Sequence, residues 1–174
     1  MFGRRYLRSC ISEGWERPTR RKIIAIVFQD STLGNRPDGS STGGLIGGFA
    51  SERAFAGETV NINVVVWRSW KLEPIATSSN DAEVQSLAVG EDVCYRLRLL
   101  WAEFNGLAQD QSELRERTRV GTSQVKGLTI TYSKGAFDSV NMTNSASLGL
   151  RRSRTAVEAL ALKECFDDEV NRLI

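Results

Sequence analysis

The feature that most constrains the fold of this chain is a short run, residues 22–28, whose last six residues are apolar and largely β-branched. A continuous apolar run of this length is typical of a strand that is buried on both faces of a sheet. Residues 43–50 and 59–67 predict a second and a third strand, and turn-forming residues separate the first two. The paired glycines at 47–48 predict a bend or bulge in the second strand.

The hydrophobic period changes from strand to helix after residue 80. Residues 80–104 place six apolar side chains on one helical stripe: Val84, Leu87, Cys94, Leu97, Trp101 and Phe104. A fourth strand is predicted over residues 127–132, a short helix over 134–142 and a long amphipathic helix over 154–173. Three consecutive strands followed by helices and one more strand predict an α/β protein, with a mixed sheet and helices packed over it.

Composition excludes several classes of function. The chain contains no histidine, which excludes His-based acid–base catalysis, Ser–His and Cys–His nucleophile pairs and His-containing zinc motifs. The three cysteines, at positions 10, 94 and 165, form no Cys-x-x-Cys pair. They predict reduced thiols in an intracellular protein, cytoplasmic or nuclear, with Cys94 and Cys165 in the core. Because the longest apolar run has only six residues, no membrane-spanning helix is expected.

Charge is distributed unevenly along the chain. Residues 1–22 carry seven basic and two acidic residues, a balance of +5, although the net charge of the whole chain is only +2. Residues 23–174 therefore carry 16 basic and 19 acidic residues, a balance of −3. We expect a basic N-terminal lead over 1–22 and one domain over 23–174. The lead either steers the chain to phosphate groups or is a solvated charged segment.

Two carboxylates stand at positions that suit a ligand site. Asp30 follows the most buried predicted strand, and open α/β sheets bind ligands at the carboxyl ends of their strands. The alternative is that Asp30 caps the turn that follows it. Glu83 lies near the start of the long predicted helix, where it either faces a site or completes a capping box with Asn80 as the N-cap. The local pattern leaves both alternatives open.

Five segments of the chain, taken in order, resemble the ribonuclease H domain of copia-type retrotransposon polyproteins. In the first, residues 28–44, an Asp at a strand end is followed by Asn-Arg, a Ser-rich turn and Gly-Gly. The other four segments are residues 66–71, 78–87, 128–140 and 147–158. The similarity extends from about residue 23 to about residue 170. It implies a ribonuclease H-like fold, with a mixed five-stranded sheet flanked by helices, and hydrolysis of the RNA strand of RNA–DNA hybrids.

The same resemblance implies a catalytic site in which carboxylates hold two Mg²⁺ or Mn²⁺ ions. On this mapping Asp30 is the first, bridging ligand and Glu83 is the second. The third ligand position is occupied by Tyr132, a large phenol that is a poor ligand for Mg²⁺. The fourth carboxylate follows a fifth strand, which we expect to be missing from a C-terminally truncated domain. Cation binding and hydrolysis are therefore expected to be weak or lost, and we do not expect Asp138 or the acidic residues 167–169 to restore them.

Nucleic acid, as an RNA–DNA hybrid or in another form, is the expected partner. The residues expected to contact it are Asn35, Arg36, Trp67, Arg68, Lys71 and Lys134. Indole rings stack on bases and cations neutralise phosphates, although a tryptophan that anchors the sheet beside an exposed basic rim is an equal alternative. For the chain as a whole, the alternatives to an impaired hydrolase are a nucleic-acid-binding module without catalysis and a retroelement relic without function.

Overall fold

A computed structural model describes residues 23–73, 75–105, 125–141, 153–166 and 171–174. The basic lead expected over residues 1–22 lies outside the described residues, as do the acidic residues 167–169.

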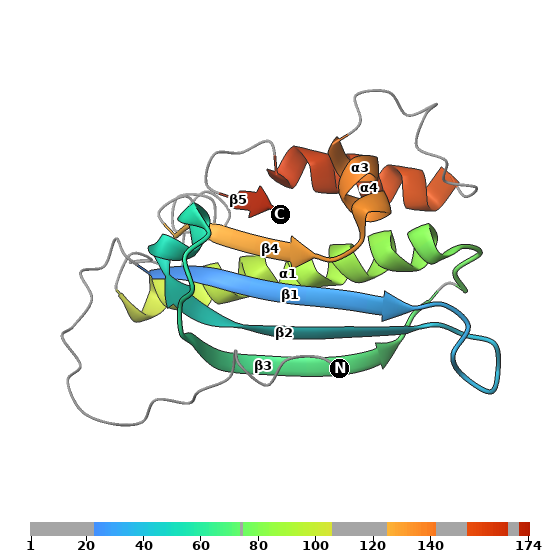
Figure 1. Cartoon of the computed structure of the whole chain (residues 1–174), viewed down its shortest axis with the longest axis horizontal. Helices are drawn as coiled ribbons and strands as arrows, with labels where there is room; N and C mark the ends of the chain where they lie inside the picture. Colours follow the sequence, from blue (N-terminus) through green and yellow to red (C-terminus); the bar gives the residue numbers. More distant parts are fainter. Residues whose placement is uncertain (1–22, 74, 106–124, 142–152, 167–170) are drawn as a thin grey trace, which may run out of the picture.

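The described residues form a mixed sheet of five strands in the order β3-β2-β1-β4-β5 (Figure 1). The first three strands, β1 (Ile23–Thr32), β2 (Thr42–Ser51) and β3 (Ile62–Lys71), pair antiparallel. The fourth, β4 (Gly127–Thr131), runs parallel to β1, and β5 (Asn171–Leu173) runs parallel to β4. The predicted α/β class and mixed sheet are confirmed.

The fifth strand that we expected to be missing is present, so this expectation was wrong. Beyond the three residues of β5, Ile174 continues the pairing: its N–H donates to the Thr129 carbonyl at 3.0 Å, and its carbonyl accepts from the Thr131 N–H at 2.9 Å. The helix expected over 154–173 ends earlier, as α4 (Ser153–Phe166). A strand of three residues is too short to have a detectable hydrophobic period, so the sequence pattern did not predict β5.

The first strand is buried on both faces, as its sequence predicts. Ala25 and Val27 pack in a cluster with Leu45 and Phe49, on the face covered by the helix described next. On the opposite face Ile24 and Ile26 pack in a second cluster with Ala50, Ala54 and Leu128. Because β1 contributes to both clusters and pairs with both β2 and β4, it is the centre of the fold.

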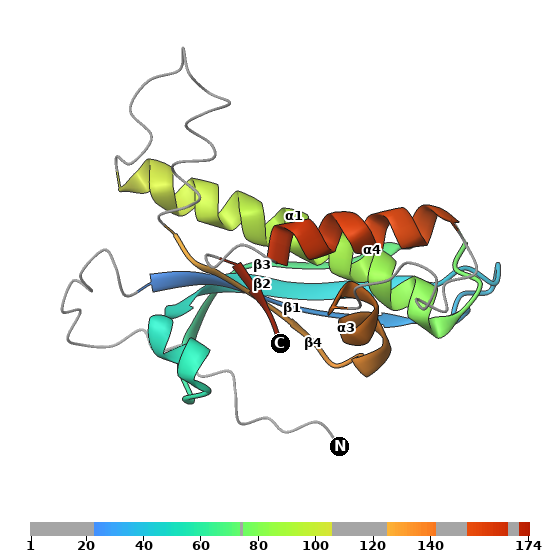
Figure 2. The same ribbon diagram turned by 90° about the horizontal axis from the view of Figure 1, so that it is seen from above.

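The long helix α1 (Ser79–Phe104) packs against β1 and β2, and α4 lies beside it on the same side of the sheet (Figure 2). The short helix α3 (Lys134–Asn141) follows β4 and contacts both α1 and α4. Gly90 allows the close approach of α1, because a β-carbon there would lie 3.2 Å from Gln29 Cγ. The opposite face of the sheet carries the short 3₁₀ helix η2 (Glu52–Ala56) at one end and is otherwise open among the described residues.

Ser78 caps α1, because its hydroxyl accepts from the Asp81 N–H at 3.1 Å, so the alternative with Asn80 as the N-cap is excluded. Two expectations about single residues were wrong. Phe104 is on the predicted stripe but is 77% exposed. Cys165 is exposed on α4, whereas Cys94 is buried as predicted. Periodicity places a side chain on a stripe, but it does not show whether another element lies opposite.

The predicted irregularity in the second strand lies at the predicted glycines. The register between β2 and β3 shifts between Gly47 and Gly48. At this point the two backbones come so close that a β-carbon at Gly48 would overlap with the Asn63 carbonyl group. At Gly44, in the same strand, a β-carbon would find its nearest neighbour, the Arg68 carbonyl oxygen, at 3.9 Å.

Gly48→Ala is therefore expected to lower the free energy of unfolding by about 1–3 kcal/mol, because the added methyl group forces the backbones apart. Gly44→Ala is the matched control and should change stability by less than about 0.5 kcal/mol. Urea unfolding followed by circular dichroism measures both. Equal midpoints for the two variants would show that β2 and β3 do not approach at Gly48 as the structure has them.

Candidate carboxylate site at the end of the first strand

Asp30 lies near the carboxyl end of β1 and is exposed to solvent. Its Oδ1 accepts a hydrogen bond from the Ser31 N–H at 2.8 Å, the kind of local bond that the turn-capping alternative expects. Its carbonyl oxygen accepts from the Ser86 hydroxyl at 3.0 Å, and this bond ties the end of β1 to α1. The backbone of Asp30 is thus fixed by the core, while its carboxylate remains accessible.

Glu83 lies one turn before Ser86 on α1 and is half-buried beside the same strand end. Burial raises the pKa of Glu83 to about 6, and the negative charge of Asp30 adds to this rise. The Ser31 hydroxyl and N–H act in the opposite direction, because they favour the ionised form. Two carboxylates separated by 53 positions in the sequence are therefore close enough to influence each other. The structure brings together the pair that the sequence analysis singled out.

Ser31 belongs to this site, although the sequence analysis did not include it. Side chains alternate along a strand, so Ser31 points to the face of α1 while Asp30 points to the other face. The Ser31 Oγ and the Glu83 Oε2 are both buried, and neither has a hydrogen-bonding partner of normal geometry. Buried polar atoms in native proteins are satisfied by protein groups, by water or by an ion. The period of two along β1 was the signal that would have identified Ser31.

The donors at this site fit one cation better than two. Carboxylate and hydroxyl oxygens from Asp30, Glu83 and Ser31 are the hard ligands that Mg²⁺ prefers, and Mg²⁺ is often held by only one or two carboxylates together with water and phosphate. Within the described part of the chain, however, no three His, Cys, Asp or Glu side chains converge to form a metal centre.

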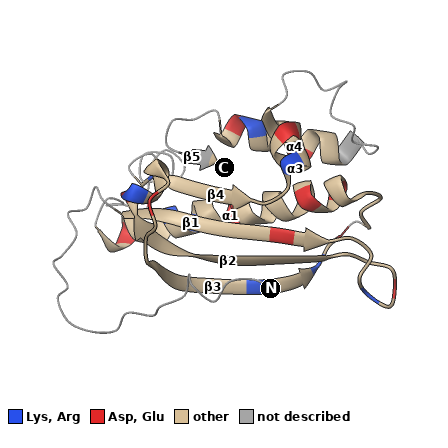
Figure 3. Ribbon diagram, viewed as in Figure 1, with Lys and Arg blue, Asp and Glu red and all other residues tan. Residues whose placement is uncertain are grey.

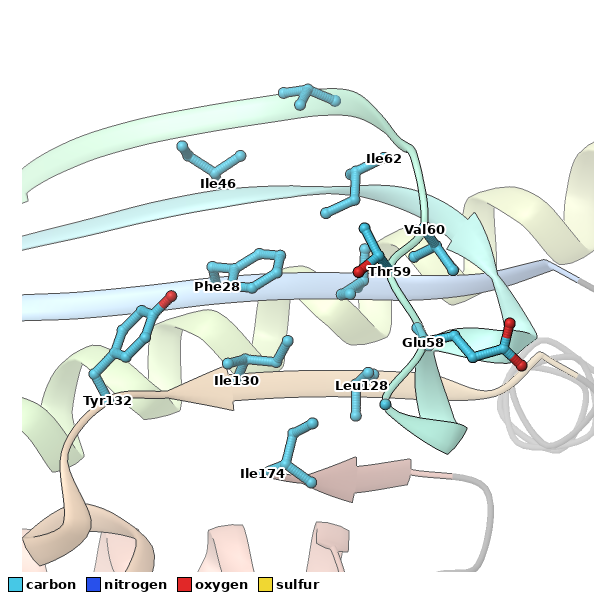
Figure 4. A pocket seen from close by; sticks show the side chains of 14 residues that line it. Phe28, Ile46, Glu58, Thr59, Val60, Ile62, Leu128, Ile130, Tyr132 and Ile174 are labelled. Carbon is cyan, nitrogen blue, oxygen red and sulfur yellow. The ribbon is translucent and has the colours of Figure 1, made fainter. Parts of the chain in front are cut away.

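Tyr132 follows β4 directly beside Asp30. Thr131 pairs with Gln29 in the parallel register of β4 and β1, so the next residues on the two strands are Tyr132 and Asp30. Tyr132 is 75% exposed, and the close-up in Figure 4 shows its ring next to Phe28. Asp30 and Tyr132 line one shallow depression, together with Gly44, Trp67, Arg68 and Ser69. A phenol therefore occupies the place nearest to the Asp30 carboxylate on the neighbouring strand.

The two tryptophans of β3 have different surroundings. Trp70 packs onto Gly43 and joins the core beneath α1, whereas Trp67 is 76% exposed on the open face. Arg68 places its guanidinium 5.3 Å from the centre of the Trp70 ring. We expected the third strand to end at Trp67, but β3 continues to Lys71, so Arg68 and Trp70 lie within the sheet. Trp70 is thus the anchor that one alternative proposed, and Trp67 is the ring available for stacking.

Three of the expected nucleic-acid contacts are engaged in the hairpin between β1 and β2. The Arg36 Nε donates to the Thr42 hydroxyl at 3.0 Å, and that hydroxyl donates to the Asn35 side chain at 2.8 Å. The Lys71 Nζ lies 2.7 Å from the Asp38 carboxylate. Hydrogen bonds from Lys71 and Ser40 hold the pKa of Asp38 far below its usual range. These residues brace the hairpin, although an exposed ion pair of this kind is easily exchanged for a phosphate contact.

The remaining predicted residues lie on α3. Lys134 is exposed at the first position of this helix, and Asp138 is half-buried one turn later. Figure 3 shows that charged residues are sparse along the ribbons of β1, β2 and β3, and Asp30 is the acidic position of β1. The expected cations among the described residues are therefore Arg36 in the hairpin, Arg68 and Lys71 on β3, and Lys134 on α3.

Comparisons of this chain with models of protein families, with curated proteins and with solved structures found no match. Among the described residues, none of the helices combines the length and the apolar character that are needed to cross a membrane.

The raised pKa of Glu83 gives a test of the site that needs no ligand. Because its pKa in the folded state is about 6, against an ordinary value of 4.5, its contribution to stability is present below pH 4.5 and is lost as the pH rises through 6. Glu83→Gln removes this loss. Since Glu83 is only half-buried, the variant should gain about 1 kcal/mol relative to the parent between those pH values.

Urea unfolding across this pH range measures the effect. Glu103→Gln, an exposed position near the end of the same helix, is the control and should leave the pH dependence unchanged. Identical pH profiles for the parent and Glu83→Gln would show that Glu83 is solvated, and not held against the end of β1.

Proposed function

We propose that this chain is a ribonuclease H-like domain of a copia-type retroelement polyprotein. Its ancestral activity is the metal-dependent hydrolysis of RNA in RNA–DNA hybrids, and this activity is impaired in the present sequence. The observation that carries the proposal is that the end of the central strand, at Asp30, is bonded to the helix turn after Glu83, so that the charge of Asp30 acts on the Glu83 carboxylate. The order of the strands and the antiparallel and parallel pairs around β1 support the same assignment.

Asp30 and Glu83 are the residues that would hold a divalent cation. Such a cation lowers the pKa of its bound water and stabilises charge on a phosphate oxygen. Because the pKa of Glu83 is raised to about 6, this side chain must lose its proton before it binds a cation, so binding strengthens above that pH. Ser31, next to Asp30 on β1, orients the Glu83 side chain with its hydroxyl and N–H.

The impairment follows from Tyr132. The resemblance places a third carboxylate at this position, on the strand next to Asp30, and a phenol there supplies no negative charge to bind the cation. Loss of even an outer partner of a metal ligand typically costs about 10–100-fold in affinity or activity. A site with two carboxylates is therefore expected to bind Mg²⁺ weakly and to hydrolyse the hybrid very slowly.

A second candidate function, binding of nucleic acid without cleavage, has an observation of its own. Two exposed aromatic rings, Trp67 and Tyr132, line the depression beside Asp30. Exposed rings of this kind are what the stacking of bases requires. Replacement of a carboxylate by tyrosine removes a repulsive charge from this surface and so favours binding while it weakens hydrolysis.

Cleavage of a labelled RNA–DNA hybrid, in Mg²⁺ and in Mn²⁺, tests the proposal. We expect no robust cleavage by the parent and a gain of at least about 10-fold in Tyr132→Asp, because the added carboxylate completes a three-ligand site. Tyr132→Asn is the matched control, since it removes the ring without adding the charge. Asp30→Asn, placed in the Tyr132→Asp chain, should abolish the gain.

Robust cleavage by the parent that Asp30→Asn abolishes would contradict the impairment. Binding of the hybrid by the parent and by Tyr132→Asp, with cleavage by neither, would favour the binding module, and the steepness of its dependence on salt would report the number of phosphate contacts. Neither binding nor cleavage by either protein would contradict both functions and leave a relic of the retroelement.

A further inference from the structure

The outer edge of β3 has no strand beside it among the described residues. The sheet has the order β3-β2-β1-β4-β5, so β3 pairs with β2 alone. An edge strand presents unpaired N–H and C=O groups to any strand that can lie beside it, and charged residues or proline commonly protect such an edge. Residues 62–67 of β3 contain neither, and four of these six residues are β-branched. This stretch is therefore suited to pairing with a further strand.

The apolar side chains of this edge are exposed. The exposed fractions of Val64, Val65 and Trp67 are 39%, 47% and 76%. Val64 lies opposite Gly48 of β2. Trp67 lies opposite Ile46, two positions away on β2, so Val64 and Trp67 are both on the open face of the sheet. An exposed valine and an exposed indole on one face of an edge strand form an apolar surface that a neighbouring strand could cover.

The charges of this edge favour one direction of pairing. Arg68 and Lys71 both belong to the last four residues of β3. A second copy of the chain that paired parallel and in register would set each cation beside itself, which is destabilising. In the antiparallel direction the two basic ends lie apart, and Lys71 comes to the side of Glu58, which precedes β3 in the second copy. Lys71 and Glu58 already pair within their own chain, but exposed ion pairs are weak and easily exchanged.

The bulge in β3 determines the register of such a pair. Ile62 and Val64 are on the open face before the bulge, and Trp67 and Ser69 are on the same face after it. In a regular strand, Val64 and Trp67 would be on opposite faces, because side chains alternate. Residues directly opposite each other in an antiparallel pair share a face. A twofold axis at the bulge meets this condition, since it sets Val64 opposite Trp67 and Ile62 opposite Ser69 of the second copy.

We propose that two copies of this chain pair antiparallel through β3, about a twofold axis between Val65 and Val66, and so form one continuous sheet. Val64 of each copy packs against Trp67 of the other, a pair of β-branched and aromatic side chains. Because both copies use the same edge, the assembly closes at two chains. The pairing does not depend on whether the chain binds or hydrolyses nucleic acid.

The interface is small. It consists of residues 62–69 of the two copies, and we expect it to bury less than the standard area of about 1,600 Å². The dimer should therefore be weak and form in the micromolar range of concentration, with Trp67 as its largest apolar contact.

Sedimentation velocity of the full-length chain, from micromolar to millimolar concentration, tests the proposal. Val64→Lys puts a charge on the edge, close to Arg68 of the second copy. Ile46→Lys is the matched control: it puts the same charge on the same face, at a residue that is 40% exposed, but on β2 and away from the edge. Circular dichroism confirms that each variant is folded. Val65→Lys, which brings two lysines together at the axis, is the second edge variant should Val64→Lys not fold.

We expect the mass of the parent to rise with concentration from 19.3 kDa toward twice that value and no further. Either edge variant should raise the dissociation constant at least about tenfold, whereas Ile46→Lys should leave it unchanged. A parent that stays monomeric at every concentration would overturn the proposal. So would a dimer that both edge variants leave intact, a dimer that Ile46→Lys weakens as much as Val64→Lys does, or a mass that grows beyond two chains.

Discussion

The packing of α1 against β1 is the interaction on which the rest of this structure depends. Gly90 lets the helix approach until a β-carbon would touch the Gln29 side chain, and the Ser86 hydroxyl binds the Asp30 carbonyl. These two contacts fix the height and rotation of the helix, and so they place Glu83 against the end of β1. The candidate site is thus a consequence of core packing. The same packing buries Glu83, and burial disfavours the ionised carboxylate that would bind a cation.

The parts that the sequence predicted are those in which local pattern and packing agree. The continuous apolar run predicted the central strand, the paired glycines predicted the bulge, and the stripe predicted the packed face of α1 up to Trp101. The resemblance, not the local pattern, joined Asp30 to Glu83. The short strand β5 was missed because three residues carry no period, and Ser78 was missed because serine and asparagine two positions apart are equally good helix caps. Ser31 needed only the alternation along β1 to be found.

The two faces of the sheet differ in the side chains that they carry near the candidate site. On the face of α1, the Glu83 carboxylate and the Ser31 hydroxyl form a buried polar position beside the apolar core. On the open face, Phe28, Ile46 and Ile130 form an apolar row. Asp30 and Tyr132 stand where the two faces meet, at the ends of neighbouring parallel strands. Under the proposed function, tyrosine at position 132 extends the aromatic surface of the open face and supplies no carboxylate to the site, so one residue would account for both properties.

Mn²⁺ titration of the ¹⁵N-labelled protein tests whether Asp30 and Glu83 hold one cation, as we propose. Mn²⁺ broadens the amide signals of residues near the ion. At a pH well above 6, we expect selective broadening at Asp30, Ser31 and Glu83, weaker broadening below that pH, and none of it in Asp30→Asn. Uniform broadening over the surface, or selective broadening that Asp30→Asn leaves intact, would show that the two carboxylates do not form a cation site.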